Sequence, residues 1–218
     1  MQEKKKFVLA VPTVIIIIIF IIALGYLIYS KNFKPLSKEK AIELAEKSVT
    51  VDNFSCQLVI EQDGEEIVAD YKRKDNMVYM KEIDYEEYLN LDTAECVYVD
   101  RENKEAYTYT SDSVLESYNT RLYAGIKSLE DENYSYTFNK YEKVNGIKCA
   151  SITLDSDLEN INMWLDTKTG MVTKYVVTNK SEGGDKFPIT YIYRYQTGNV
   201  TDDDIKIPDL SDYTVLEM

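Results

Sequence analysis

The chain has 218 residues, with 38 acidic and 25 basic side chains, a net charge of −13 and no histidine. Without histidine the usual general base near neutral pH and the commonest metal ligand are missing, which excludes Ser-His-Asp and Cys-His catalysis and most zinc sites. The acidic excess also excludes nucleic-acid binding through phosphates.

Residues 7–29, FVLAVPTVIIIIIFIIALGYLIY, form an uncharged run of 23 residues. A helix rises about 1.5 Å per residue, so this run is long enough to span a hydrocarbon core of about 30 Å. A cleaved signal peptide is the alternative, but its apolar region covers about 7–15 residues and ends at a small-x-small site. The run is longer, and residues 24–30 offer no such site. We therefore predict an uncleaved transmembrane helix over 7–29.

The orientation of this helix rests on its flanks. Lysines stand on both sides, three at positions 4–6 and four between 31 and 40, so the positive-inside rule does not decide. The short basic stub, residues 1–6, favours a cytoplasmic N-terminus. Residues 41–218 carry a net charge of −18 and are rich in Tyr and Thr, which suits an extracytoplasmic setting. We expect a single-pass cell-membrane protein with a linker over 30–36, an extracytoplasmic β-rich domain over 37–210 and a tail over 211–218.

Two amphipathic helices are predicted in the domain. Ser37 caps the first, which runs to Val49. Its polar face mixes Lys with Glu, which favours packing on a sheet over lying on a membrane. The second covers about 113–130, with capping-box spacing between Ser113 and Glu116. Its apolar stripe predicts docking on the core; the stripe consists of Leu115, Tyr118, Leu122, Ile126 and Leu129.

The rest of the domain alternates as strands do. Asp63-Gly64 and Asn145-Gly146 are typical hairpin turns. Residues 77–80 are apolar at every position, so we expect both faces of that strand to be covered. The tail after Val200 is acidic, and Pro208 interrupts any strand there. The predicted strands cover 54–61, 66–73, 77–83, 96–100, 105–110, 134–144, 147–155, 161–165, 171–178 and 189–195.

The fold class is therefore α+β. After the N-terminal transmembrane helix we expect a curved antiparallel sheet, or open half-barrel, of about nine or ten strands with two packed helices.

Three cysteines, Cys56, Cys96 and Cys149, are widely spaced and odd in number, so they are not a complete disulfide set. Whether two of them pair stays open. Cys56 shares a strand face with apolar residues and is expected to be buried. The acidic residues at 155, 157 and 159 resemble the start of a calcium loop. Asn160 stands where that loop needs Gly, and we expect no metal site there. No catalytic residue and no cofactor is predicted.

The 19 tyrosines are the compositional oddity, and several recur at strand period two. An aromatic-lined concave sheet is one way to hold an apolar ligand. The alternative is that these rings pack under the helices or pair across strands. The candidate ligand-lining residues are Tyr107, Tyr109, Tyr134, Tyr136, Phe138, Trp164, Tyr191, Tyr193 and Tyr195.

Residues 163–174, MWLDTKTGMVTK, place W-x-D on a strand that turns through Thr-Gly into the next strand. This pattern resembles a signature of the LolA/LolB-like lipoprotein-carrier superfamily. The order of helix, strands, helix and meander over about 37–210 is similar too. The resemblance implies a curved sheet, closed off by helices, that holds lipid or acyl chains. This chain departs from the pattern in having a membrane anchor and no lipidation cysteine near it, which implies a tethered module.

Two functions follow as hypotheses. In the first, the domain is a membrane-anchored, non-catalytic envelope protein that binds lipid or another hydrophobic ligand in an aromatic-lined half-barrel. In the second, it is a cavity-free interaction or sensory module that contacts an envelope protein through exposed tyrosines. The expected partners are the membrane through residues 7–29, a lipid or hydrophobic ligand, and an envelope protein.

Overall fold

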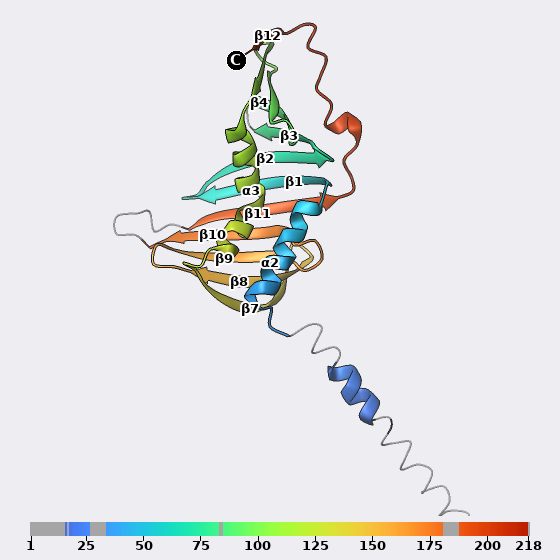
Figure 1. The fold of residues 1–218 in the computed structure, drawn as a ribbon, viewed down its shortest axis with the longest axis vertical. Helices are drawn as coiled ribbons and strands as arrows, with labels where there is room; N and C mark the ends of the chain where they lie inside the picture. Colours follow the sequence, from blue (N-terminus) through green and yellow to red (C-terminus); the bar gives the residue numbers. More distant parts are fainter. Residues whose placement is uncertain (1–15, 17, 27–33, 83–84, 181–187, 218) are drawn as a thin grey trace, which may run out of the picture. The chain divides into compact units, whose positions relative to one another are not determined.

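The computed structural model describes residues 16, 18–26, 34–82, 85–180 and 188–217 (Figure 1). The chain divides into two compact units, Met1–Leu36 and Ser37–Met218. In the first unit residue 16 and residues 18–26 are helical and exposed. Over the described ranges, no helix has the length and apolar character that a membrane span needs. Residues 7–15, 17 and 27–29 of the predicted anchor lie outside the described residues.

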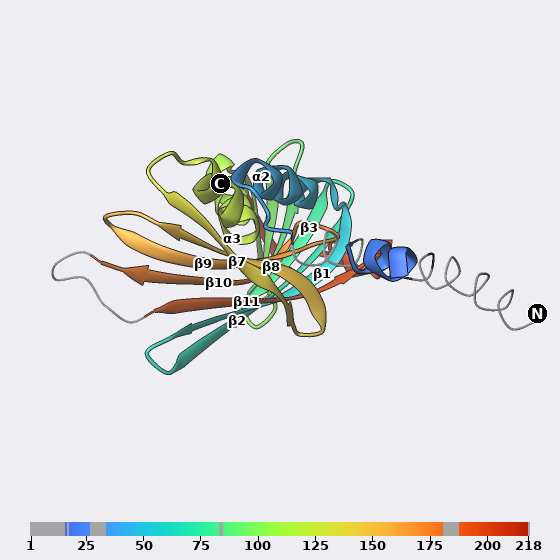
Figure 2. The same cartoon turned by 90° about the horizontal axis from the view of Figure 1, so that it is seen from below.

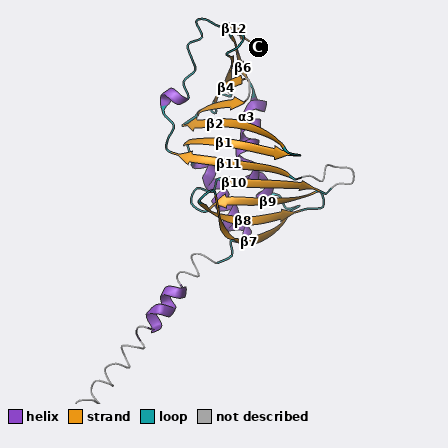
Figure 3. Ribbon diagram, turned by 180° about the vertical axis from the view of Figure 1, so that it is seen from behind, coloured by secondary structure: helices purple, strands orange, loops and turns teal. Residues whose placement is uncertain are grey.

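The second unit is built on one open sheet of 12 strands, in the order β12-β6-β5-β4-β3-β2-β1-β11-β10-β9-β8-β7. Neighbouring strands are antiparallel, except that β12 runs parallel to β6. The sheet twists along its length and has β12 and β7 at its two edges (Figures 1 and 3). The strands are β1 (Asn53–Gln62), β2 (Glu65–Lys74), β3 (Met77–Glu82), β4 (Tyr85–Asn90), β5 (Glu95–Asp100), β6 (Glu105–Thr110), β7 (Ser135–Val144), β8 (Ile147–Asp155), β9 (Glu159–Asp166), β10 (Val172–Asn179), β11 (Ile189–Thr197) and β12 (Thr214–Glu217).

The two predicted Gly-containing hairpins are confirmed. Asp63 and Gly64 have φ angles of 53° and 83°, and Asn145 and Gly146 have 51° and 83°. Positive φ at both central positions is the type I′ geometry, whose twist matches that of the flanking strands. These turns therefore set the register of β1 with β2 and of β7 with β8.

Both helices lie on one face of the sheet (Figure 2). Helix α2 (Lys38–Glu46) begins at the predicted cap, where Ser37 Oγ accepts the Lys40 N–H at 3.4 Å. It continues into the 3-10 turn η1 (Lys47–Thr50). Helix α3 (Asp112–Glu130) is capped by Ser111, whose Oγ accepts the Val114 N–H. The predicted cap at Ser113 is wrong, because Ser111 already supplies the acceptor two residues earlier and Ser113 lies inside the helix.

The core lies between these helices and the sheet. Tyr118, Leu122 and Leu129 of the predicted α3 stripe are buried, which confirms that this stripe docks on the core. Opposite them the sheet supplies fully buried apolar side chains from β1, β8 and β9, including Leu58, Ile152 and Met163. Strand alternation puts the neighbours of these residues on the other face of the sheet.

The sequence prediction of nine or ten strands is too low. Strand β4 was missed because Glu86 and Glu87 interrupt its apolar pattern, and both are buried through distant partners. Strand β12 lies within residues 211–218, expected as a tail, and it forms by pairing with β6 more than a hundred residues away. The three cysteines are free and buried, so Cys56, Cys96 and Cys149 form no disulfide with one another.

Candidate functional site

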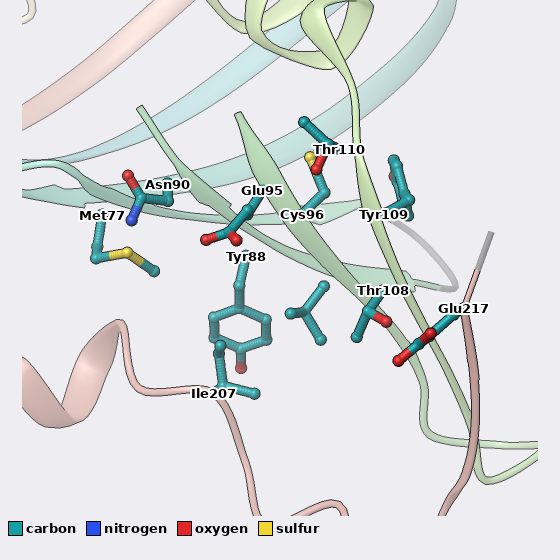
Figure 4. Close-up of a pocket in the computed structure, with 11 residues that line it drawn as sticks. Met77, Tyr88, Asn90, Glu95, Cys96, Thr108, Tyr109, Thr110, Ile207 and Glu217 are labelled. Carbon is teal, nitrogen blue, oxygen red and sulfur yellow. The ribbon is translucent and has the colours of Figure 1, made fainter. Parts of the chain in front are cut away.

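A pocket of about 550 Å³ lies between strands β3–β6 and the segment that follows β11 (Figure 4). Its apolar lining comes from Met77, Tyr88, Val97 and Ile207. Polar groups, among them Asn90, Glu95, Thr108 and Glu217, surround this apolar part.

The pocket faces away from the helices. Tyr88 pairs in register with Val97 on one side and Tyr79 on the other, so these three side chains share a face. Glu87, next to Tyr88 in β4, lines a different pocket together with residues of α3. Because successive side chains of a strand point to opposite faces, Tyr88 and Val97 lie on the outer face of the sheet.

The C-terminal segment, residues 198–217, closes one side of this pocket and is held at both ends (Figure 3). Near its start the Asn53 side chain binds the backbone of Val200 in both directions, at 2.9 and 3.0 Å. Lys72 then pairs with Asp204 at 2.7 Å, and Lys74 pairs with Asp202. At its end β12 pairs with β6. Ile207 is thereby positioned against the apolar part of the pocket.

A buried carboxylate, paired with two exposed cations, lies on the same outer face. Glu86 is two residues before Tyr88 in β4, and its carboxylate lies 2.6 Å from Arg101 and 3.8 Å from Lys81. Burial by itself raises the pKa of Glu86, but the hydrogen bond and charge of Arg101 and the charge of Lys81 outweigh it. The pKa of Glu86 therefore lies below its ordinary value of 4.5. These cations allow an acidic residue to sit in the middle of a buried strand.

The tyrosines predicted on β11 lie on the helix-covered face. Tyr193 is 2% exposed, and its hydroxyl donates to the Arg121 carbonyl of α3 at 2.8 Å. Tyr195 packs edge-on against Phe54, and Tyr191 packs against Tyr175. These rings fill space between the sheet and α3. They therefore follow the alternative to ligand lining, in which the rings pack under the helices.

Most of the remaining candidate ligand-lining residues lie on or next to strands near the two edges of the sheet, β7 and β6. Tyr136 and Phe138 are half-buried on β7, and Tyr134 just before it donates to Glu159. On β6, Tyr107 donates to Glu105 at 2.6 Å and Tyr109 donates to Glu87. Of all nine candidates, each of which the structure describes, Tyr109 is the one that borders the 550 Å³ pocket, but its hydroxyl lies on the helix-covered face with Glu87.

Trp164 lies on the face opposite the helices, since its neighbours Met163 and Leu165 are fully buried on the core side. Its indole N–H donates to Glu142 at 2.7 Å, and Lys174 lies 5.2 Å from the ring centroid. It is therefore engaged at the surface and does not line the pocket.

Sequence reasoning missed Met77, Tyr88, Val97 and Ile207. One signal pointed to them, because the apolar run at 77–80 predicted that both faces of β3 are covered. The helices cover one face, where Val78 and Met80 are buried, and Met77 lines the pocket on the other. The other face of β3 is covered by the C-terminal segment. That segment has no periodic apolar pattern from which its packing on the sheet could be predicted.

Within the described part of the chain, no group of three or more His, Cys, Asp or Glu side chains could hold a metal ion. The geometry thus defines an open, mostly antiparallel sheet with helices on one face and a partly apolar pocket on the other.

No protein-family model and no curated protein matches the sequence. Among solved structures, MucB in complex with MucA is similar at 15% identity and a TM-score of 0.48, covering 83% of this chain and 62% of that one. The Mycobacterium tuberculosis lipoprotein LppX is similar at 9% identity and a TM-score of 0.39, covering 72% and 95%. A Vibrio parahaemolyticus domain described as an outer membrane lipoprotein-sorting protein gives 13% identity and a TM-score of 0.32, covering 78% and 97%.

LppX and the lipoprotein-sorting domain are structures of the kind that the W-x-D and Thr-Gly pattern indicated, and the chain is similar to them in fold alone. With TM-scores below 0.5 they carry no inference about ligand or activity. The chain spans less than two thirds of the MucB chains that it matches.

Proposed function

We propose that this protein is a membrane-tethered, extracytoplasmic and non-catalytic binding domain. It holds a lipid or another hydrophobic ligand in the pocket between strands β3–β6 and the C-terminal segment. The observation that carries this proposal is the pocket of about 550 Å³ with its apolar lining of Met77, Tyr88, Val97 and Ile207.

The size and lining of the pocket support a small amphiphilic ligand. Ligand sites typically enclose about 300–1,000 Å³ and combine apolar walls with a few placed polar groups. Here the apolar side chains lie together, and Asn90, Glu95 and Thr108 offer hydrogen-bonding groups around them. An apolar chain would contact Tyr88 and Val97 while its polar end reached Asn90 or Thr108.

The tether is the second part of the proposal. The uncharged run over 7–29 is long enough to span a bilayer, and the net charge of −18 on residues 41–218 suits an extracytoplasmic position. In this arrangement the domain stays at the membrane that supplies an apolar ligand, and no diffusing carrier step is needed.

Binding of the neutral dye 1-N-phenylnaphthylamine to the full chain in detergent micelles tests the site. Val97→Phe replaces an isopropyl group in the pocket by a larger aromatic ring and should weaken dye binding by about tenfold. Val68→Phe is the matched control, because Val68 lies on the outer face of β2 and does not line the pocket. Equal dye affinity in the two variants, at equal unfolding midpoints, would rule the pocket out as the site.

A second function is favoured by how tightly α3 packs on the sheet around Gly125. A Cβ added at Gly125 of α3 would lie 2.7 Å from Met163 Sδ, so this part of the helix–sheet interface has no room for a ligand. Such a domain could instead bind an envelope protein through the edge strand β7, which has a partner strand on one side only. Tyr193 is buried under α3, so it is not one of the exposed tyrosines that such an interaction would use.

Site-specific crosslinking in native membranes separates the two functions. A photoreactive residue at Thr137 on the β7 edge should yield one identified partner if strand addition occurs, and the same group at Gln57 in the middle of the sheet should not. Equal yields from the two positions would count against an edge interaction.

A further inference from the structure

A smaller pocket of about 290 Å³ lies on the helix-covered face, between the N-terminal half of α3 and strands β3 and β4. It is separate from the site proposed above, since the sheet lies between them. Met80, Tyr85, Val114 and Tyr118 give it apolar and aromatic walls, and its polar groups are Glu82, Glu87, Ser113, Ser117 and Arg121.

The charges in this pocket do not cancel. Arg121 forms an ion pair with Glu82 and also donates to the Tyr71 hydroxyl at 3.2 Å, so Glu82 is compensated. Glu87 is only 8% exposed and accepts a hydrogen bond from Tyr109, but no ion pair joins it to a cation among the described residues. A buried carboxylate without a cationic partner is costly, because one neutral hydrogen bond replaces little of its hydration.

Aromatic rings stand close to this carboxylate. Tyr85 lines the pocket and stacks on Tyr98, with ring centroids 5.3 Å apart and planes 22° apart. Burial, together with the hydrogen bond to Glu82, raises the pKa of Tyr85 to about 12, so the ring stays neutral at physiological pH. The faces of neutral phenol rings attract cations.

We propose that this pocket binds the ammonium group of a small alkylamine, with Glu87 as the counter-ion and Tyr85 and Tyr118 beside the alkyl chain. An ammonium has three N–H donors, so it can bind Glu87 and a Ser113 or Ser117 hydroxyl together. A metal ion fits less well, since in the described residues no cluster of three or more His, Cys, Asp or Glu side chains is present to ligate it. The acidic excess of residues 41–218 would also raise the local concentration of cations.

Isothermal titration of the full chain in non-ionic micelles with n-hexylammonium and with n-hexanol tests the proposal. The two probes have equal chains and differ in charge, so the ammonium should bind at least about tenfold more tightly. Equal affinities, or no binding of the ammonium, would overturn it. This comparison needs no variant, so it stands whether or not a substitution disturbs the fold.

Glu87→Gln keeps an acceptor for the Tyr109 hydroxyl but removes the charge. It should weaken n-hexylammonium binding by about tenfold and leave n-hexanol binding unchanged. Glu116→Gln is the matched control, because Glu116 is an exposed acid of α3 outside the pocket. An equal loss in both variants would mean that the overall charge attracts the amine and the pocket does not.

The ammonium could come from a free amine or from an aminophospholipid head group. Competition for n-hexylammonium by phosphatidylethanolamine vesicles but not by phosphatidylcholine vesicles would assign the lipid source, and competition by neither would assign the free amine. Val97→Phe changes the 550 Å³ pocket and should leave n-hexylammonium binding unchanged. The amine site and the proposed hydrophobic site can therefore be tested, and can fail, independently of each other.

Discussion

At the scale of single residues, Asp166 and Gly170 explain the turn that resembles a carrier signature. Asp166 accepts from the Lys168 N–H at 2.9 Å and from the Thr169 hydroxyl at 2.7 Å, and its backbone bonds close the turn onto Gly170 and Met171. Gly170 has a φ of 77°, and a Cβ there would overlap the carbonyl oxygen of Leu44 in α2. The motif is therefore a turn packed against a helix.

Gly170→Ala should lower the free energy of unfolding by at least about 2 kcal/mol, because it combines left-handed strain with a clash against backbone. Gly64→Ala is the control, since Gly64 has a φ of 83° but nothing within 4 Å of the added Cβ. That change should cost only about 1 kcal/mol. Urea unfolding measures both, and equal losses would contradict the close approach to α2.

Arg101→Met tests the ion pair at Glu86 through its pH dependence. The folded-state pKa of Glu86 is lowered, so its contribution to stability is complete above the unfolded value of 4.5 and is lost as the pH falls through the folded pKa. The variant should be less stable than wild type at pH 7, and the difference should shrink below pH 4.5. Arg194→Met, at an exposed residue that donates to Gln57, is the control. A stability difference that is constant with pH would contradict the assigned cause.

At the scale of elements, the C-terminal segment forms one wall of the proposed site and lacks a periodic apolar pattern. The side chain of Asp204 closes the capping box with Thr201 in η2 (Asp202–Asp204) and also binds Lys72. The hydrogen bonds to Lys72 and Thr201 hold the pKa of the Asp204 carboxyl well below its usual range, and the bond to Lys72 makes the largest contribution. The segment is thus attached to the sheet mainly through polar contacts.

Asp204→Asn should loosen the C-terminal segment and speed hydrogen exchange at the amides of β12 and around Ile207. Asp203→Asn, next in sequence, is the control because no ion pair of Asp203 is present among the described residues. Exchange mass spectrometry compares the two at neutral pH. Identical exchange in both variants would show that the contact between Lys72 and Asp204 does not hold the segment.

Elements with local signals were predictable, and elements with distant partners were not. Asn145-Gly146 fixes its hairpin through its own φ preferences, and Ser37 caps α2 within one turn. Strand β4 instead depends on Arg101 and Tyr109 to accommodate its two buried acids, and β12 depends on β6. No local pattern in YEEYLN or TVLE encodes those partners.

At the scale of the whole molecule, period-two alternation predicted which side chains share a face of the sheet. It did not predict which face carries the larger pocket. Tyr191, Tyr193 and Tyr195 do share a face, as expected, yet α3 covers it and their rings fill it. The larger pocket lies on the opposite face and against other strands, β3–β6, where the C-terminal segment crosses the sheet. Its position depends on packing between distant segments, which alternation does not record.

The proposed tether gives a prediction at the same scale. Ile18→Lys combined with Ile21→Lys puts two charges into the apolar run, at a cost of about 2.5–3.5 kcal/mol each at a bilayer centre. The variant should leave the membrane fraction on alkaline carbonate extraction. Glu65→Lys with Glu66→Lys, at exposed positions of β2, is the control and should stay in the membrane. Retention of both variants would contradict a transmembrane role for 7–29.

The proposed function requires a hydrophobic ligand in the pocket formed by Met77, Tyr88, Val97 and Ile207. The most direct measurement is mass spectrometry of organic extracts from the full chain, purified from its own membranes as wild type, Val97→Phe and Val68→Phe. We predict a defined lipid or other apolar compound, near one per chain, in wild type and Val68→Phe and its loss in Val97→Phe. Extracts without such a compound, or equal amounts from all three proteins, would contradict the proposed function.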